Sequence, residues 1–162
     1  MSESGSMNPE ETHRVFARQT NGRVWELLEK KGRTPAEERE MLAAAYASLF
    51  HWLHAGTVVH EQRGEWLIAR AHLELGQQGE ALRHARHCRD LTEANQAAME
   101  DFDIAFAEEL MARVDSLRGE DAPARQAVQR ALAAGQAIRD AEDRQIFFDT
   151  LRGGPWGEVR PE

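Results

Sequence analysis

The feature that most constrains the fold is a set of signals that occurs twice, 43 positions apart. In each copy a segment with helical spacing of apolar residues ends at a glycine, Gly76 or Gly119. An alanine five positions later, Ala81 or Ala124, opens the next helical segment. A repeated helical hairpin cannot bury its apolar face alone, so neighbouring hairpins stack and the stack offers a curved face to a partner. The repeat therefore predicts a protein built of stacked helical hairpins.

The remainder of the chain predicts the same fold class, all-α. No segment shows the alternation of apolar and polar residues that is typical of a strand. Every long segment has helical periodicity, and the connections are short, which favours antiparallel hairpins. We expect about six or seven helices in a single domain over 9–152, with a flexible lead at 1–8 and a tail at 153–162. Its expected parts are hairpins at about 9–55, 57–95 and 101–139 and a capping helix at about 141–152.

Local signals place the helix boundaries in the first third of the chain. Gly32 suits the end of one helix, while Thr34, Pro35 and Glu37 form the start of the next with a capping box. The pair Asn21-Gly22 predicts a break within the first helix. The second helix has too many apolar residues for a narrow stripe, so we expect it to be central and buried on more than one side. These residues are Leu42, Ala45, Tyr46, Leu49, Phe50, Trp52 and Leu53.

Composition excludes several classes of protein. Twenty Lys and Arg against 28 Asp and Glu give a net charge of −8, and this average field repels a phosphate backbone, so we expect no nucleic acid partner. No apolar run approaches the roughly 20 residues of a membrane span. The single cysteine, Cys88, cannot form a disulfide within the chain, and the sequence shows no targeting pattern at its start. We therefore expect a cytoplasmic protein without an obligatory cofactor.

The segment from Trp66 to Leu82, WLIARAHLELGQQGEAL, resembles a tetratricopeptide repeat in its small Ala69, terminal Gly76 and opening Ala81. Residues 105–132 resemble a second, degenerate copy. The resemblance implies hairpins stacked as a short right-handed superhelix, with long repeats because the offset exceeds the usual 34 residues. The sequence departs from the pattern at Glu65, His72 and Asp115, where the repeat has Trp, Tyr and Tyr.

The same resemblance implies a binding groove lined by the first helix of each hairpin. The groove-facing positions are Arg63, Trp66, Arg70, Leu73, Phe106, Glu109, Arg113 and Leu117. Arginine and aromatic residues supply much of the binding energy at protein interfaces, so an acidic peptide, a C-terminal tail or a second copy of the chain would fit. The alternative is that Trp66 and Phe106 are buried against the N-terminal hairpin while Arg70 and Arg113 pair with Glu74 and Glu109.

Seven histidines offer the best sequence argument for chemistry. His51, His54 and His60 form one group, and His84 and His87 form a second group beside Cys88. Zinc accepts imidazole, thiolate and carboxylate ligands, and a helical bundle can assemble them from facing helices. Each group holds only a fragment of a ligand set, and neither contains an HExxH pattern. A metal-dependent bundle enzyme is therefore the alternative to binding, and solvent-facing or hydrogen-bonded histidines are the ordinary explanation.

The function that these observations favour is a non-catalytic, protein- or peptide-binding scaffold. No glycine-rich phosphate loop and no nucleophile elbow occurs in the sequence, and no residue is expected to be catalytic. A third reading is a regulatory sensor whose helices close around a small molecule.

Overall fold

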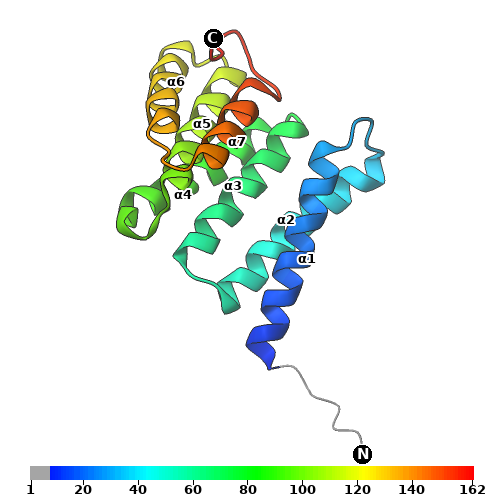
Figure 1. Cartoon of the computed structure of the whole chain (residues 1–162). Helices are drawn as coiled ribbons and strands as arrows, with labels where there is room; N and C mark the ends of the chain where they lie inside the picture. Colours follow the sequence, from blue (N-terminus) through cyan, green and yellow to red (C-terminus); the bar gives the residue numbers. More distant parts are fainter. Residues whose placement is uncertain (1–7) are drawn as a thin grey trace, which may run out of the picture.

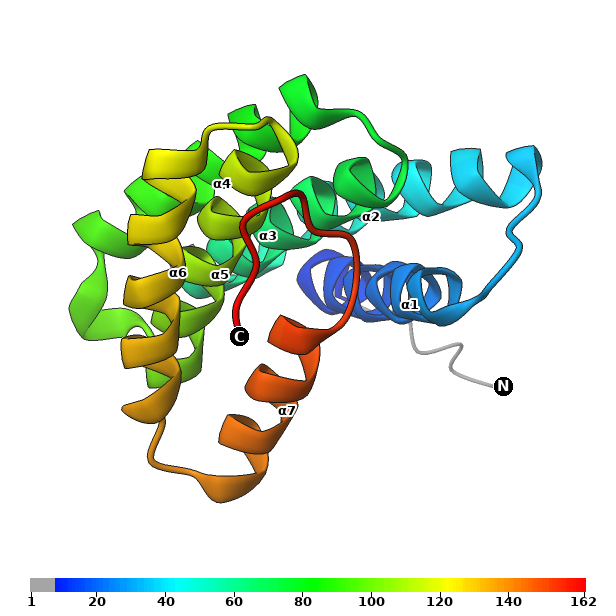
Figure 2. The same ribbon diagram turned by 90° about the horizontal axis from the view of Figure 1, so that it is seen from above.

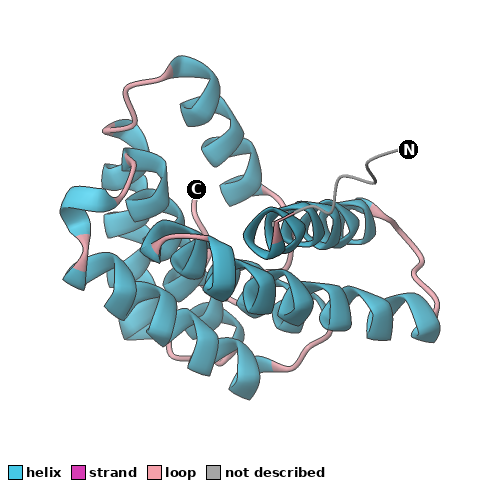
Figure 3. Ribbon diagram, turned by 90° about the horizontal axis from the view of Figure 1, so that it is seen from below, coloured by secondary structure: helices cyan, strands magenta, loops and turns pink. Residues whose placement is uncertain are grey.

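The computed structural model describes residues 8–162, which form seven α helices, one short 3-10 turn and no strand (Figure 3). The elements are α1 (Pro9–Glu29), α2 (Pro35–Ala55), α3 (Val58–Glu74), α4 (Gln78–Ala94), η1 (Gln96–Ala98), α5 (Asp101–Leu117), α6 (Asp121–Gln136) and α7 (Ala141–Arg152). The all-α prediction is confirmed. Of the expected lead at 1–8, residues 1–7 lie outside the described part, and Asn8 caps α1 by accepting a hydrogen bond from the Glu10 amide at 2.9 Å.

The helices form three antiparallel hairpins, α1/α2, α3/α4 and α5/α6, which follow one another along an arc (Figure 1). Viewed from above, α1, α3 and α5 lie on the inner side of the arc and α2, α4 and α6 on the outer side (Figure 2). Helix α7 packs on α5 and α6 and closes one end. The chain after α7 then returns along the inner side of the arc (Figure 2).

The repeated glycines end α3 and α5 in the same way. Gly76 and Gly119 have φ of 70° and 75°, a left-handed conformation that glycine adopts at no steric cost. The amide after each glycine donates to a carbonyl in the last helical turn, Gln77 to His72 and Glu120 to Asp115, both at 2.9 Å. This pattern is the Schellman motif, which satisfies carbonyls that the helix end leaves free. Because α3 and α5 end in the same motif, the turns of the second and third hairpins have matching geometry.

Small residues let the helices of each hairpin cross closely. Ala69, Ala81, Ala112 and Ala124, which occupy matching positions in the two copies, are all completely buried. The largest core cluster runs through α1 to α5 and has α3 at its centre, with buried residues from Gly64 to Leu73.

The prediction that α2 is the central helix is therefore wrong. Helix α2 belongs to the outer layer and to the N-terminal end of the stack, where no further hairpin among residues 8–162 covers it. Phe50 is 52% exposed and Leu53 is 57% exposed. Its high apolar content indicated burial, whereas its position at the end of the described stack leaves one face in solvent.

The capping box at the start of α2 is confirmed, because the Glu37 amide donates to Thr34 Oγ1 at 3.2 Å and the Thr34 amide to Glu37 Oε2 at 2.9 Å. The predicted break at Asn21-Gly22 is wrong, since α1 is continuous through both residues. Glycine inside a helix costs only about 1 kcal/mol, which the packing of α1 along α2 outweighs.

Within residues 8–162, no helix combines the length and apolarity needed to cross a lipid bilayer.

Candidate functional site

An aromatic cavity of about 240 Å³ lies on the inner side of the arc, where α1, α3 and α5 meet. Its walls are Trp25 from α1, Trp66 from α3, and Phe102 and Phe106 from α5. Trp66 and Phe106 are two of the predicted groove residues. Trp25 was not predicted, because a single tryptophan on an amphipathic helix gives no sign of which neighbouring helix it will meet.

The aromatic rings hold one another in fixed positions. The rings of Trp25 and Trp66 are stacked with centroids 5.7 Å apart, and Trp66 meets Phe106 edge-on at 5.5 Å. Trp66 Nε1 donates to the Phe106 carbonyl at 3.2 Å, so its one polar atom is satisfied. Trp66 is only 7% exposed, whereas Trp25 is 42% exposed. The cavity thus has a rigid apolar base and one exposed aromatic wall.

The rim of the aromatic cavity carries an ion pair. Arg63 donates to both carboxylate oxygens of Asp103, from Nε at 2.8 Å and from Nη2 at 3.0 Å. Asp103 is 2% exposed and Arg63 is 43% exposed as side chains, so the carboxylate faces inward and the guanidinium faces the rim. Arg63 Cζ also lies 4.9 Å from the Phe102 ring centroid, a cation–π contact. Asp103 therefore holds Arg63 in place at the mouth of the cavity.

A second, more polar hollow of about 380 Å³ adjoins the first and shares Asn21 and Arg63 with it. We call it the cationic hollow, because Arg18 and Arg63 line it together with Trp52 and His60. Burial lowers the pKa of His60, which keeps its imidazole neutral near pH 7. Positive charge at this place therefore comes from the arginines, and because Arg63 is paired with Asp103, the charge of Arg18 is the one without a carboxylate partner in the lining.

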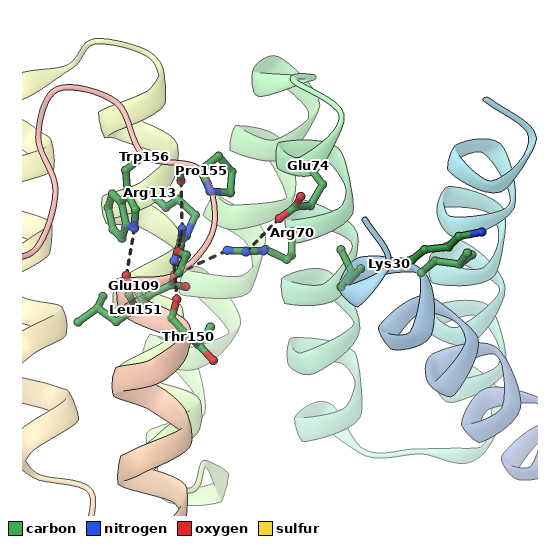
Figure 4. Close-up of polar contacts among 12 residues, drawn as sticks. Lys30, Arg70, Glu74, Glu109, Arg113, Thr150, Leu151, Pro155 and Trp156 are labelled. Carbon is green, nitrogen blue, oxygen red and sulfur yellow. Dashed lines mark hydrogen bonds and ion pairs between the residues drawn. The ribbon is translucent and has the colours of Figure 1, made fainter. Parts of the chain in front are cut away.

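Three of the other predicted groove residues, Arg70, Glu109 and Arg113, form a charged cluster in the interior (Figure 4). Glu109 and Arg113 are completely buried, and Arg113 Nε donates to Glu109 Oε1 at 2.6 Å. Arg70 pairs with Glu74 at 3.0 Å. Desolvation lowers the pKa of Arg113 from its ordinary value, although the Glu109 carboxylate opposes that shift. These are the pairings that the alternative reading of the sequence described.

The segment expected only as a tail, 153–162, is docked against this cluster. Arg113 donates to the carbonyls of Thr150 at 3.0 Å, Gly153 at 2.8 Å and Pro155 at 3.0 Å (Figure 4). Its guanidinium lies 4.3 Å from the Trp156 ring, and Trp156 Nε1 donates to the Leu151 carbonyl at 3.0 Å. Leu73 is buried in the core, and Leu117 packs against the same core cluster.

The eight predicted groove residues are thus divided between two places. Arg63, Trp66 and Phe106 line the aromatic cavity. Leu73, Glu109 and Arg113 are buried, Arg70 and Leu117 are partly buried, and α7 with the tail occupies the inner side of the arc beside α5. The open part of the inner surface is the part next to α1.

The histidines predicted as candidate ligands lie in separate places. His51 Nδ1 is 2.8 Å from His13 Nδ1, and His54 stacks on the His13 ring at 4.6 Å. His60 stacks on Trp52 at 4.1 Å and accepts from the Thr57 amide, while His87 Nε2 is 3.6 Å from Glu61. His84 comes together with His72 and Glu80, and among the described residues this is the one group of three whose possible ligand atoms all lie within 4.8 Å of one another. Cys88 is completely buried, and this burial raises the pKa of its thiol, so it is no reactive ligand.

Neither a protein-family model, nor a curated protein, nor a solved structure matches this chain.

Proposed function

We propose that the chain is a tetratricopeptide-like helical-repeat module that binds an extended peptide segment of another protein on the inner side of its arc. The observation that carries the proposal is the aromatic cavity with the cationic hollow beside it, because together they offer an apolar socket next to positive charge. Interface energy commonly concentrates in such places, where aromatic residues and arginine surround a desolvated pocket. The proposed partner therefore carries an apolar side chain beside an acidic residue or a free carboxylate.

The volume of the aromatic cavity favours a side chain over a whole metabolite. At about 240 Å³ it is smaller than the roughly 300–1,000 Å³ of typical small-molecule sites, but it accommodates one aromatic or branched aliphatic side chain. The protein's own tail supports the same mode of binding, because α5 already holds an extended segment through Arg113 and Ser116. A peptide would extend this kind of contact towards α1. No residue is assigned a catalytic role.

Filling the cavity tests this proposal. Asn21 lines both hollows from α1, and an indole at this position occupies the space that the ligand side chain needs. We expect Asn21→Trp to weaken binding at least tenfold relative to the natural chain without changing its unfolding midpoint by more than a few degrees. The measurement is fluorescence anisotropy with an array of labelled peptides, each with one aromatic or aliphatic residue flanked by Asp and Glu, and matched peptides carrying Lys instead.

Gln126→Trp is the matched control, since Gln126 is exposed on α6 in the outer layer. It adds the same side chain outside the groove and should leave peptide binding unchanged. Binding should also weaken as salt is raised, because the arginines of the cationic hollow attract the acidic residues. The proposal is wrong if no acidic peptide binds better than its Lys counterpart, or if Asn21→Trp and Gln126→Trp bind equally.

A further inference from the structure

A second polar cluster lies away from the groove, on the outer side of the contact between the first two hairpins. It brings together Tyr46 from α2, His72 from the last turn of α3, and His84 from α4. The two imidazole rings are stacked with centroids 5.8 Å apart and an interplanar angle of 10°. Both Nε2 atoms face the Tyr46 hydroxyl, at 3.0 Å for His72 and 2.9 Å for His84. Three helices thus direct three polar atoms to one point.

The hydrogen bonds on the other side of each ring fix the tautomers. His72 Nδ1 lies 2.6 Å from Gln77 Oε1, and His84 Nδ1 lies 2.5 Å from Glu65 Oε2. An amide oxygen and a carboxylate oxygen only accept, so each Nδ1 carries the proton and donates it. With the proton on Nδ1, each ring presents the lone pair of its Nε2 to the same point.

This arrangement leaves more acceptors than donors. The Tyr46 hydroxyl has one hydrogen and donates to only one of the two Nε2 lone pairs at a time. Arg83 Nη2 is the nearest further donor, 3.4 Å from His84 Nε2, which is too long for a good hydrogen bond. The cluster therefore lacks a hydrogen-bond donor at its centre, and the Arg83 guanidinium at its edge is too distant to supply one well.

A carboxylate completes the set. Glu80 lies in the first turn of α4, one helical turn before His84, and its oxygen and the two imidazole nitrogens all lie within 4.8 Å of one another. We propose that His72, His84 and Glu80 bind a divalent transition-metal ion of the zinc type, with the Tyr46 hydroxyl or a water molecule as the fourth ligand. Two histidines and one glutamate form a known zinc ligand set, and imidazole suits this class of ion.

The surroundings are those that a metal site requires. Glu65 and Gln77 hold the outward ring nitrogens, the arrangement by which ligand histidines are oriented and made more basic. His72 and His84 are buried, whereas Tyr46 is 39% exposed and Glu80 is exposed, so an ion has a path from solvent. Glu65 and His72 are also two positions at which the sequence departs from the tetratricopeptide pattern. With the Tyr46 hydroxyl as the fourth ligand, the ion would join the first hairpin to the second and so stabilise the stack.

The test uses the full chain without an affinity tag, stripped by a chelator and titrated with zinc in a calorimeter and with cobalt in an optical spectrometer. We expect one ion per chain, an absorption spectrum of tetrahedral cobalt, and a higher unfolding temperature with zinc present. His72→Gln should abolish binding. Glu80→Gln should weaken zinc binding at least tenfold. If His72→Gln fails to fold, Glu80→Gln provides the test instead, because Glu80 is exposed and makes no core contact.

Arg83→Gln separates a metal site from an ordinary buried hydrogen-bond cluster. Arg83 pairs with Glu80 at 2.7 Å, so its guanidinium competes with the ion for the carboxylate and repels it. Removing this charge should raise zinc affinity several-fold, whereas a purely structural cluster predicts no gain. His87→Gln on the same helix and His51→Gln in the other histidine group are the matched controls, and both should bind zinc like the natural chain.

Three results would overturn the proposal. The first is the absence of stoichiometric zinc or cobalt binding by the natural chain. The second is a loss of binding in His87→Gln or His51→Gln equal to that in Glu80→Gln, which would place the ion elsewhere. The third is nitrogen magnetic resonance showing both ring nitrogens of His84 protonated in excess zinc, which would mean that a proton occupies the centre of the cluster.

Discussion

Ala69 shows how strictly single positions control this fold. It is completely buried in the central helix α3, and Ala112 occupies the matching place in α5. We expect Ala69→Trp to lower the free energy of unfolding by about 1–3 kcal/mol or more, because overpacking forces neighbouring side chains and backbone to move. Urea unfolding followed by far-ultraviolet dichroism measures this change. Ala133→Trp, at an exposed position of α6, is the control and should change stability by less than about 0.5 kcal/mol.

At the same scale, the candidate sites were only partly predictable. Trp66, Phe106 and Arg63 could be placed in a groove because the resemblance to a tetratricopeptide repeat gives them groove-facing positions in the first helix of each hairpin. Trp25 could not, since its role depends on how α1 docks on α3. His72 and Tyr46 were missed as partners of His84 because the three residues lie on three different helices. In the sequence, Tyr46 is 26 positions from His72 and 38 positions from His84. Such convergence is a property of packing, which periodicity does not encode.

Among the elements, the start of α2 has a measurable dependence on pH. Lys30 donates a hydrogen bond to Glu37, and this bond, together with the Thr34 amide, lowers the pKa of Glu37 from 4.5 to about 2. A carboxyl whose pKa is lower in the folded state stabilises that state above its unfolded pKa and loses the effect as pH falls to the folded pKa. The capping box should therefore contribute fully above about pH 4.5 and weaken between pH 4.5 and 2.

Glu37→Gln tests this contribution. The variant keeps a capping side chain but has no carboxyl group, so it should be less stable than the natural chain near pH 7 and equal to it near pH 2. Thermal melting across this pH range gives the comparison, and Glu142→Gln in the exposed first turn of α7 serves as the control. A stability difference that stays constant from pH 7 to pH 2 would contradict the assignment.

Helix boundaries followed from the sequence where a local motif decides them. Gly76, Gly119 and Thr34 act through their own backbone and nearest neighbours, so their roles were visible in the chain. The continuity of α1 through Gly22 and the exposed face of α2 depend on tertiary contacts, or on their absence at the end of the stack. Local preferences worth about 1 kcal/mol cannot override those contacts.

For the whole molecule, the docked tail should be part of the folding unit. A chain ending at Arg152 loses the carbonyls of Gly153 and Pro155, and it leaves Arg113 with unsatisfied donors in a buried place. Hydrogen bonds to charged groups contribute roughly 1.5–3 kcal/mol each, so we expect the truncation to cost a few kcal/mol. A chain ending at Arg160 keeps these contacts and Val159, and it should melt like the full chain. Equal melting of both truncated chains would show that the tail is dispensable.

The way in which Arg113 holds that segment also has an evolutionary consequence. All three of its acceptors at this end of the molecule are main-chain oxygens, which every amino acid supplies. Selection can therefore let many residues after position 152 vary, but three are constrained: Gly154 by its φ of 74°, Trp156 by its contact with Arg113, and Gly157 because a Cβ there would lie 2.2 Å from the Ser116 carbonyl oxygen. Position 113 has no such freedom. Distant descendants of this chain should preserve a buried arginine on α5 long after their C-terminal sequences have ceased to be alignable.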